Sequence, residues 1–233
     1  MNLKKLATVA SIVLAFAGSQ ASAETAGRWE QWLNTYYQHP QPEKVVQAAY
    51  GLNREGYFDQ AGSVPTAIGF FSTVFAANPD KVDGWFANFR ELPVSEQRVM
   101  ASALWYSGNP KGEQKLVALA RSAAPESRQE IEQLVSKPIT EVASTPVLSD
   151  SSMNLQWGAF LASGEERNVT NILAAIGRGQ IGDSARVSLA FNAAQHDRVL
   201  QICRAQLDKQ PNEVRSVLRA VINDAETKKQ PTS

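Results

Sequence analysis

The sequence predicts an all-α protein made of stacked antiparallel helical hairpins, arranged as an α-solenoid or as an irregular helical array. Three observations support this prediction. Apolar side chains recur at three- and four-residue spacing along most of the chain, which places them on one face of a helix. Asn-Pro, Leu-Pro and Ser-Gly pairs interrupt these stretches at regular intervals. Convincing alternation of apolar and polar residues, which is typical of strands, is absent from the sequence.

The first predicted helix carries four large apolar side chains on one face: Trp29, Trp32, Leu33 and Tyr36. Pro40 and Pro42 end this helix, because proline lacks an amide hydrogen and restricts the residue before it. A second helix is expected over residues 43–53, with Gly51 weakening its end. Ser63 is a suitable N-cap for the third helix.

The remaining helices are predicted in the same way from apolar groups at helical spacing. In the first half of the chain these groups begin at Ile68, Val82, Val99, Leu116 and Ile131. In the second half the helices are expected near residues 152–162, 166–176, 183–194, 197–208 and 212–226.

Two joints between predicted helices resemble each other. Residues 75–79 and 106–110 both close an aromatic-rich helix with Asn-Pro, and they lie about thirty residues apart, near the period of a helix–turn–helix repeat. A third joint, at residues 160–165, repeats the Ser-Gly pair of the second. Because glycine adopts the left-handed conformation without steric cost, we expect Gly108 and Gly164 to end their helices in that conformation.

By this spacing, rather than by residue identity, residues 65–207 resemble the broad class of degenerate helical-hairpin, tetratricopeptide-like repeat proteins. The resemblance implies hairpins that stack because a single amphipathic hairpin cannot bury its apolar face alone. It identifies no binding residues.

The amino terminus has the three-part pattern of a cleavable export signal over residues 1–23. Two lysines precede an apolar run at residues 6–17, and residues 21–23 supply the small-x-small pattern of a cleavage site. The run is shorter than the ~20 residues that span a bilayer, although an uncleaved anchor is the alternative. We therefore expect a periplasmic or secreted protein whose mature chain begins at Glu24.

Composition between the helices predicts the domain organisation. Prolines, β-branched residues and small hydroxyl side chains predict a linker or extended loop at residues 138–150. This loop separates an N-terminal helical region, residues 24–137, from a C-terminal helical region, residues 151–227. Residues 228–233 are expected to form a disordered tail. The sequence leaves open whether the two helical regions form one domain or two.

Charge and cysteine content argue against several classes of function. Removal of the signal would leave 21 basic and 23 acidic residues, a formal charge of −2, so the surface offers no electrostatic reason to bind nucleic acid or an anionic membrane. No apolar run after residue 17 is long enough to form a transmembrane segment. Cys203 is the sole cysteine, and its apolar neighbours indicate a buried thiol rather than a redox site.

Motifs for catalysis or cofactor binding are missing from the sequence. His39 and His196 have no acidic or cysteine neighbours at metal-ligand spacing, so no metal ion or other cofactor is expected. The glycines of residues 177–182 resemble a phosphate-binding pattern, but they follow a helix rather than a strand and are expected to form a turn.

The aromatic side chains are the remaining candidates for a binding role. Most are expected in the core, while Trp85, Trp105 and Trp157 are candidate partner-binding residues on a concave face. The sequence thus favours an exported helical binding or adaptor protein of the bacterial envelope, with no catalytic residue and with a protein or peptide partner. Two alternatives stay open: a structural helical domain, and a glycan-cleaving enzyme whose carboxylate pair is Glu165 with Glu166 or Glu130 with Glu132.

Overall fold

The structure, a computed structural model, describes residues 27–109, 111–123 and 125–229. The predicted export signal and residues 230–233 lie outside these ranges. Within them the chain forms twelve α-helices, four short 3-10 helices and no strand, so the all-α prediction is confirmed. The finer prediction of a solenoid stays a prediction.

The predicted helices are present, with ends that differ by a few residues. The first half contains α2 (Arg28–Thr35), α3 (Val45–Arg54), α4 (Ser63–Ala77), α5 (Val82–Phe89), α6 (Val94–Tyr106), α7 (Gly112–Ser122) and α8 (Pro125–Val135). The second half contains α9 (Asp150–Ser163), α10 (Glu166–Leu173), α11 (Gln180–Gln195), α12 (Asp197–Gln206) and α13 (Asn212–Lys229). The 3-10 helices are η3 (Tyr36–Gln38), η4 (Pro42–Lys44), η5 (Tyr57–Asp59) and η6 (Val142–Ser144).

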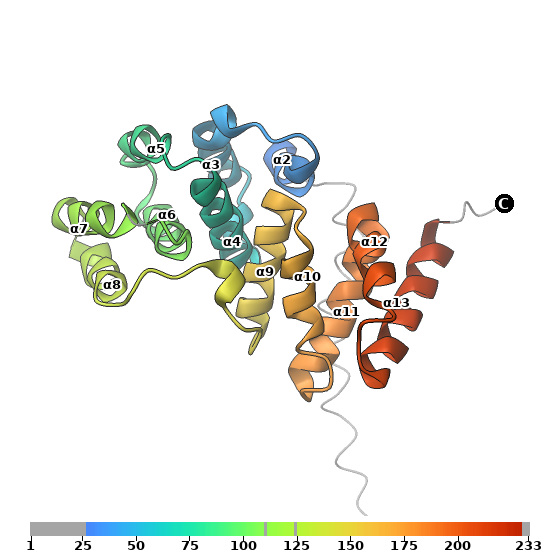
Figure 1. The fold of residues 1–233 in the computed structure, drawn as a ribbon. Helices are drawn as coiled ribbons and strands as arrows, with labels where there is room; N and C mark the ends of the chain where they lie inside the picture. Colours follow the sequence, from blue (N-terminus) through green and yellow to red (C-terminus); the bar gives the residue numbers. More distant parts are fainter. Residues whose placement is uncertain (1–26, 110, 124, 230–233) are drawn as a thin grey trace, which may run out of the picture.

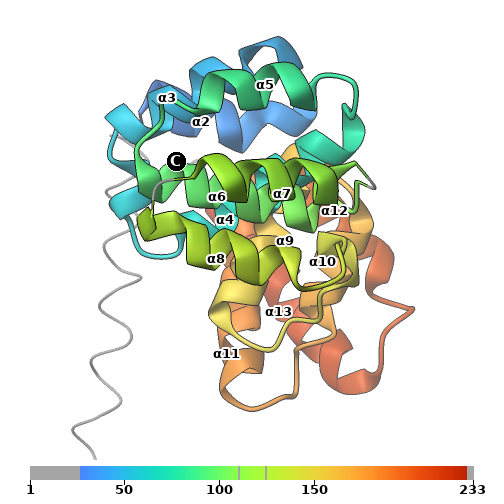
Figure 2. The same cartoon turned by 90° about the vertical axis from the view of Figure 1, so that its left-hand side faces the viewer.

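Helices α4 and α9 lie side by side at the centre of the molecule (Figure 1). The hairpins of α5 to α8 project to one side of this pair, and α10 to α13 lie on the other side. Figure 2 views the molecule from the side of α5 to α8. The buried apolar side chains of both helical regions form a continuous core. Over the described residues, no helix combines the length and the apolar character needed to cross a membrane.

Two glycines allow the close approach of α4 and α9. A Cβ atom added to Gly69 would lie less than 3.0 Å from the Leu155 carbonyl oxygen, and one added to Gly158 would lie less than 3.0 Å from the Thr66 carbonyl oxygen. Both distances are shorter than real contacts to Cβ. The two backbones therefore pack directly against each other, and every residue from 155 to 162 is buried.

The loop predicted at residues 138–150 packs against α9 and α10 rather than running free. The buried Gln156 side chain donates hydrogen bonds to the carbonyl oxygens of Val142 and Thr145, both at 2.8 Å. Asn171 donates to the Ala143 carbonyl oxygen at 2.9 Å. These amides satisfy polar groups that an irregular segment cannot pair by itself, and they hold η6 against the core.

Two local predictions about glycine are confirmed. Gly108 has φ +65° and Gly164 has φ +66°, both in the left-handed region. Gly164 caps α9, and its amide donates to the Phe160 carbonyl oxygen at 2.7 Å. The chain can therefore leave α9 sharply and begin α10 two residues later.

Candidate functional site

The three tryptophans predicted to bind a partner take part in separate contacts. Trp85 is only 6% exposed and packs against Phe75. Trp157 is 5% exposed, and its indole donates a hydrogen bond to Ser188. Trp105 is half-buried, and its indole donates to the Lys137 carbonyl oxygen at 3.3 Å. The structure therefore places two of the three indoles in the core, and direct contact of any of them with a partner stays a prediction.

Three of the four candidate carboxylates have basic or amide partners in the described part of the chain. Those partners are Arg167 for Glu165, Gln206 and Lys209 for Glu166, and Arg98 for Glu130. Within the described ranges, the surface hollows between α2 and α3, beside η6, between α7 and α8, and between α5 and α7 are each lined by at most one acidic residue. This geometry gives no specific support to glycosidase chemistry, which needs two carboxyl groups facing one bond.

The other candidate reactive groups, Cys203, His196 and the glycines of residues 177–182, take part in core packing or in a turn. Cys203 is fully buried, as predicted, and burial raises the pKa of its thiol to about 12, which keeps it protonated and unreactive near neutral pH. His196 lies against the rings of Tyr37 and Phe160. Residues 177–182 form the expected turn and helix start, with left-handed φ at Gly177 and Gly179. Across the described ranges, no group of three or more His, Cys, Asp or Glu side chains is placed to hold a metal ion.

An apolar hollow of about 460 Å³ lies between α5, α6, α7 and α8. A smaller hollow of about 110 Å³ adjoins it and shares Phe86, Arg90, Leu119 and Ser122 with it. We call the two together the α5–α7 groove. Its other lining residues are Phe89, Gln97, Met100, Ala123 and Ile131 in the larger hollow, and Asp83, Ala87, Lys115 and Ala118 in the smaller one.

The sequence explains why this groove is open. The aromatic face of α5 points inward, so Phe86 and Phe89 form part of the apolar floor. Opposite them, α7 presents the small side chains of Ala118 and Ser122, which are too short to fill the space. Phe86 and Phe89 are themselves buried, so the surface that is open in the groove includes the half-buried Leu119 and the exposed Ala118 and Ser122.

Charged side chains line the smaller hollow. Asp83 of α5 and Lys115 of α7 form an ion pair across it, and this pairing lowers the pKa of Asp83 through a hydrogen bond and charge attraction. Arg90, just after α5, lines both hollows and has no acidic partner among the described residues. The groove thus combines an apolar floor with one cation whose charge is not matched locally.

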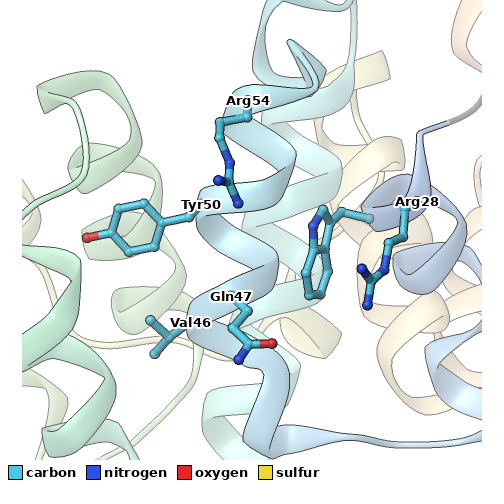
Figure 3. Close-up of a pocket in the computed structure, with 6 residues that line it drawn as sticks. Arg28, Val46, Gln47, Tyr50 and Arg54 are labelled. Carbon is cyan, nitrogen blue, oxygen red and sulfur yellow. The ribbon is translucent and has the colours of Figure 1, made fainter.

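A second pocket, of about 430 Å³, lies between α2 and α3 (Figure 3). We call it the arginine–tryptophan pocket. Its lining residues are Arg28 and Trp29 from α2, and Val46, Gln47, Tyr50 and Arg54 from α3. Arg28 and Tyr50 lie on opposite sides in Figure 3, with Gln47 and Arg54 between them.

A third, smaller cavity of about 170 Å³ lies beside η6 and is lined by Asn168, Tyr106 and Glu141 among others. The Asn168 side chain is buried, and its Oδ1 has no hydrogen-bond partner among the described atoms. That oxygen is itself inaccessible to solvent. The cavity is therefore a weaker candidate than the two open sites, because a ligand in it does not reach the unpaired atom.

Comparison of the chain with protein-family models, with curated proteins and with solved structures found no match. Function is therefore argued from the two open sites. Sequence analysis missed the residues that give them their character, Arg28, Arg54 and Arg90. A single arginine on a helix gives no signal in a sequence. Whether its charge is paired depends on acidic residues that are far away in the sequence but close in space.

Proposed function

We propose that the protein is a non-catalytic helical binding protein of the bacterial envelope, and that it engages a protein or peptide partner through the α5–α7 groove. The observation that carries the proposal is an apolar hollow of about 460 Å³ between neighbouring helices, with the half-buried Leu119 at its surface and the buried rings of Phe86 and Phe89 beneath it. Large apolar side chains inserted into such hollows dominate the energy of many protein interfaces.

The groove also indicates the chemistry of the partner. Its floor suits an apolar anchor, such as a leucine or an aromatic residue, presented by one face of a helix. Arg90 suits an acidic residue next to that anchor, since its guanidinium has no local acid to bind. Helical-hairpin repeat proteins use concave surfaces between neighbouring helices in this manner, and the proposal places the chain in that broad class.

Site-directed photo-crosslinking in the native envelope tests the proposal. A photoreactive amino acid replaces Ser122, which lines the groove, or Ser216, an exposed residue of α13. We expect discrete adducts from position 122 and not from position 216. Adding Ala118→Arg, which fills the groove, should reduce the adducts about tenfold, because it removes the apolar contact.

Ala220→Arg is the matched control, because Ala220 is also an exposed helical alanine but lies on α13. It should leave the adducts unchanged. Circular dichroism of each variant checks that the helices remain intact. Adducts that persist in Ala118→Arg, or that appear equally from position 216, would contradict a role for the groove.

The proposed location is tested separately. We expect the protein in the periplasmic fraction or the medium, and amino-terminal sequencing should begin at Glu24. Exported material that still contains Lys4 and Lys5 would contradict signal cleavage, whatever the outcome at the groove.

A further inference from the structure

The arginine–tryptophan pocket is a second site with a distinct chemical character. Gly51 of α3 makes it possible, because a Cβ atom at this position would overlap the Trp29 indole. With glycine there, the indole packs against α3 and remains half-buried at the surface. One wall of the pocket is thus an aromatic ring whose position is fixed by the helix behind it.

Two arginines at this pocket have no acidic partner among the described residues. The Arg28 guanidinium lies 5.2 Å from the centroid of the Trp29 ring, a cation–π contact that leaves its N–H groups available. Arg54 is exposed, and its side chain forms no hydrogen bond or ion pair within the described ranges. Surface arginines are often solvated in this way, but here both lie at one concave, partly aromatic surface.

Glu55, which follows Arg54 in the sequence, binds other groups. The Glu55 carboxylate accepts hydrogen bonds from the backbone amides of Trp29, at 3.1 and 3.2 Å, and of Glu30, at 3.3 Å. It therefore neutralises the positive amino-terminal end of α2. The carboxylate is thereby held at the helix end, and neither arginine has it as an ion-pair partner.

The remaining walls are rigid and partly apolar. The Tyr50 hydroxyl donates to the Asn88 carbonyl oxygen at 2.8 Å, which fixes the phenol against the end of α5. Val46 supplies an aliphatic surface, and Gln47 supplies an exposed amide. The pocket therefore offers two cations, an amide and apolar walls within one hollow of about 430 Å³.

We propose that the arginine–tryptophan pocket binds an acidic peptide segment, with a carboxylate at Arg54 and Arg28 and an adjacent apolar side chain against Trp29 and Val46. Guanidinium groups bind carboxylates through paired N–H donors, which gives both strength and orientation. The proposal goes beyond the α5–α7 groove and does not depend on it, since the two sites share no lining residue.

A singly charged carboxylate fits better than a phosphate. Glu30 and Glu55 lie close to the two arginines in sequence and surround the start of α2 with negative charge. Burial, together with the neighbouring charge of Glu55, raises the pKa of Glu30. The negative charge of these glutamates repels a dianion about twice as strongly as it repels a singly charged carboxylate. A carboxylate with an apolar neighbour also gains contact with the indole.

Titration calorimetry on the purified protein tests this proposal with three probes. The first is a blocked tetrapeptide of two glutamates and two leucines, the second is its glutamine analogue, and the third is inorganic phosphate at equal ionic strength. We expect the acidic peptide to bind, the glutamine analogue to bind at least about tenfold more weakly, and phosphate not to compete.

Arg28→Gln and Arg54→Gln should each weaken the acidic peptide about fivefold, and the double variant should weaken it further. Arg219→Gln, at an exposed position of α13, is the matched control and should leave the affinity unchanged. Ala118→Arg in the groove should also leave it unchanged, so failure at one site does not imply failure at the other. Equal binding of phosphate, no binding of the acidic peptide, or full affinity in the double variant would overturn the proposal.

Discussion

Helices α4 and α9 approach so closely that their backbones meet (Figure 1). Helices α5 and α7, in contrast, are separated by the α5–α7 groove. Both pairs have small residues at the contact. In the first pair these are Gly69 and Gly158, which face carbonyl groups of the opposite helix. In the second they are Ala87 and Ala118, which line open space. A small residue thus permits close packing only where the other side chains of the helix are also buried against its neighbour.

The difference follows from what surrounds each pair. Helix α9 is buried along residues 155–162 and joins the two helical regions through one core. Helix α7 belongs to a peripheral hairpin with α8, and its outer positions remain exposed. We infer that stability is concentrated at the α4–α9 pair. The proposed binding groove lies at the periphery, where a substitution alters the surface without disrupting the core.

The largest expected effect is at the α4–α9 contact. Gly158→Ala should lower the free energy of unfolding by about 3 kcal/mol or more, because the new methyl group meets the Thr66 carbonyl oxygen and the helices must separate. Gly84→Ala in α5 is the matched control, since a Cβ atom there has nothing within 4 Å. It should stabilise the protein by about 0.5–1 kcal/mol through helix propensity. Urea midpoints measure both, and equal values would contradict the comparison.

The next effect concerns the amide that holds η6 to α9. Gln156→Leu should cost about 2–3 kcal/mol, because it leaves the Thr145 carbonyl oxygen without that donor in a partly buried position. Gln201→Leu, at an exposed site of α12, should change stability by less than about 0.5 kcal/mol. Hydrogen exchange should also show faster exchange in residues 142–145 of Gln156→Leu. Unchanged exchange there would mean that other contacts hold the loop.

These two sites show how far sequence analysis reaches. Helix positions follow from spacing, and the left-handed Gly108 and Gly164 follow from the residues around them, because both depend on neighbours in the chain. Gly69 and Gly158 give no such signal. From the sequence alone, a glycine inside a helix is only expected to lower helix stability. The carbonyl group that leaves no room for a Cβ atom belongs to a helix about ninety residues away in the sequence.

The same reason explains the candidate sites. Helical spacing places Trp85 and Trp157 on an apolar face, but it does not say which helix covers that face. In the structure other helices cover both. Trp29 was assigned to a helix face by the same reasoning, yet its indole lines a surface pocket because α3 meets it at Gly51. Exposure is a property of the assembled core, so spacing alone does not determine it.

An intermediate effect is expected at the end of α9. Gly164→Ala should cost about 1–2 kcal/mol, because alanine is strained at φ +66° and its methyl group would lie 2.9 Å from Tyr37 Cδ2. Gly56→Ala has nearly the same φ, +67°, but its nearest neighbour lies 3.8 Å away. It should cost about 1 kcal/mol, which isolates the backbone strain. If Gly56→Ala is the more harmful variant, the Tyr37 ring moves aside and the end of α9 is less tightly packed than the contact indicates.

The smallest effect is expected at the ion pair that spans the α5–α7 groove. Asp83 is fully exposed, and its partner Lys115 is partly exposed. Such surface pairs contribute little, because water and salt screen the attraction and two flexible side chains must be ordered. We therefore expect Asp83→Asn to leave the urea midpoint unchanged at low and at high salt.

The pH dependence of stability tests whether the Asp83–Lys115 ion pair is screened by solvent or holds α5 to α7. Because Lys115 lowers the pKa of Asp83 in the folded state, any stabilisation is present above the unfolded pKa and is lost as the pH falls through the lowered value. If exposure screens the pair, the parent and Asp83→Asn should show the same urea midpoints from neutral pH down through this range. A parent that loses stability there, while Asp83→Asn does not, would show that the ion pair holds α5 to α7. In that case, separation of α5 from α7 at the groove would require the ion pair to break.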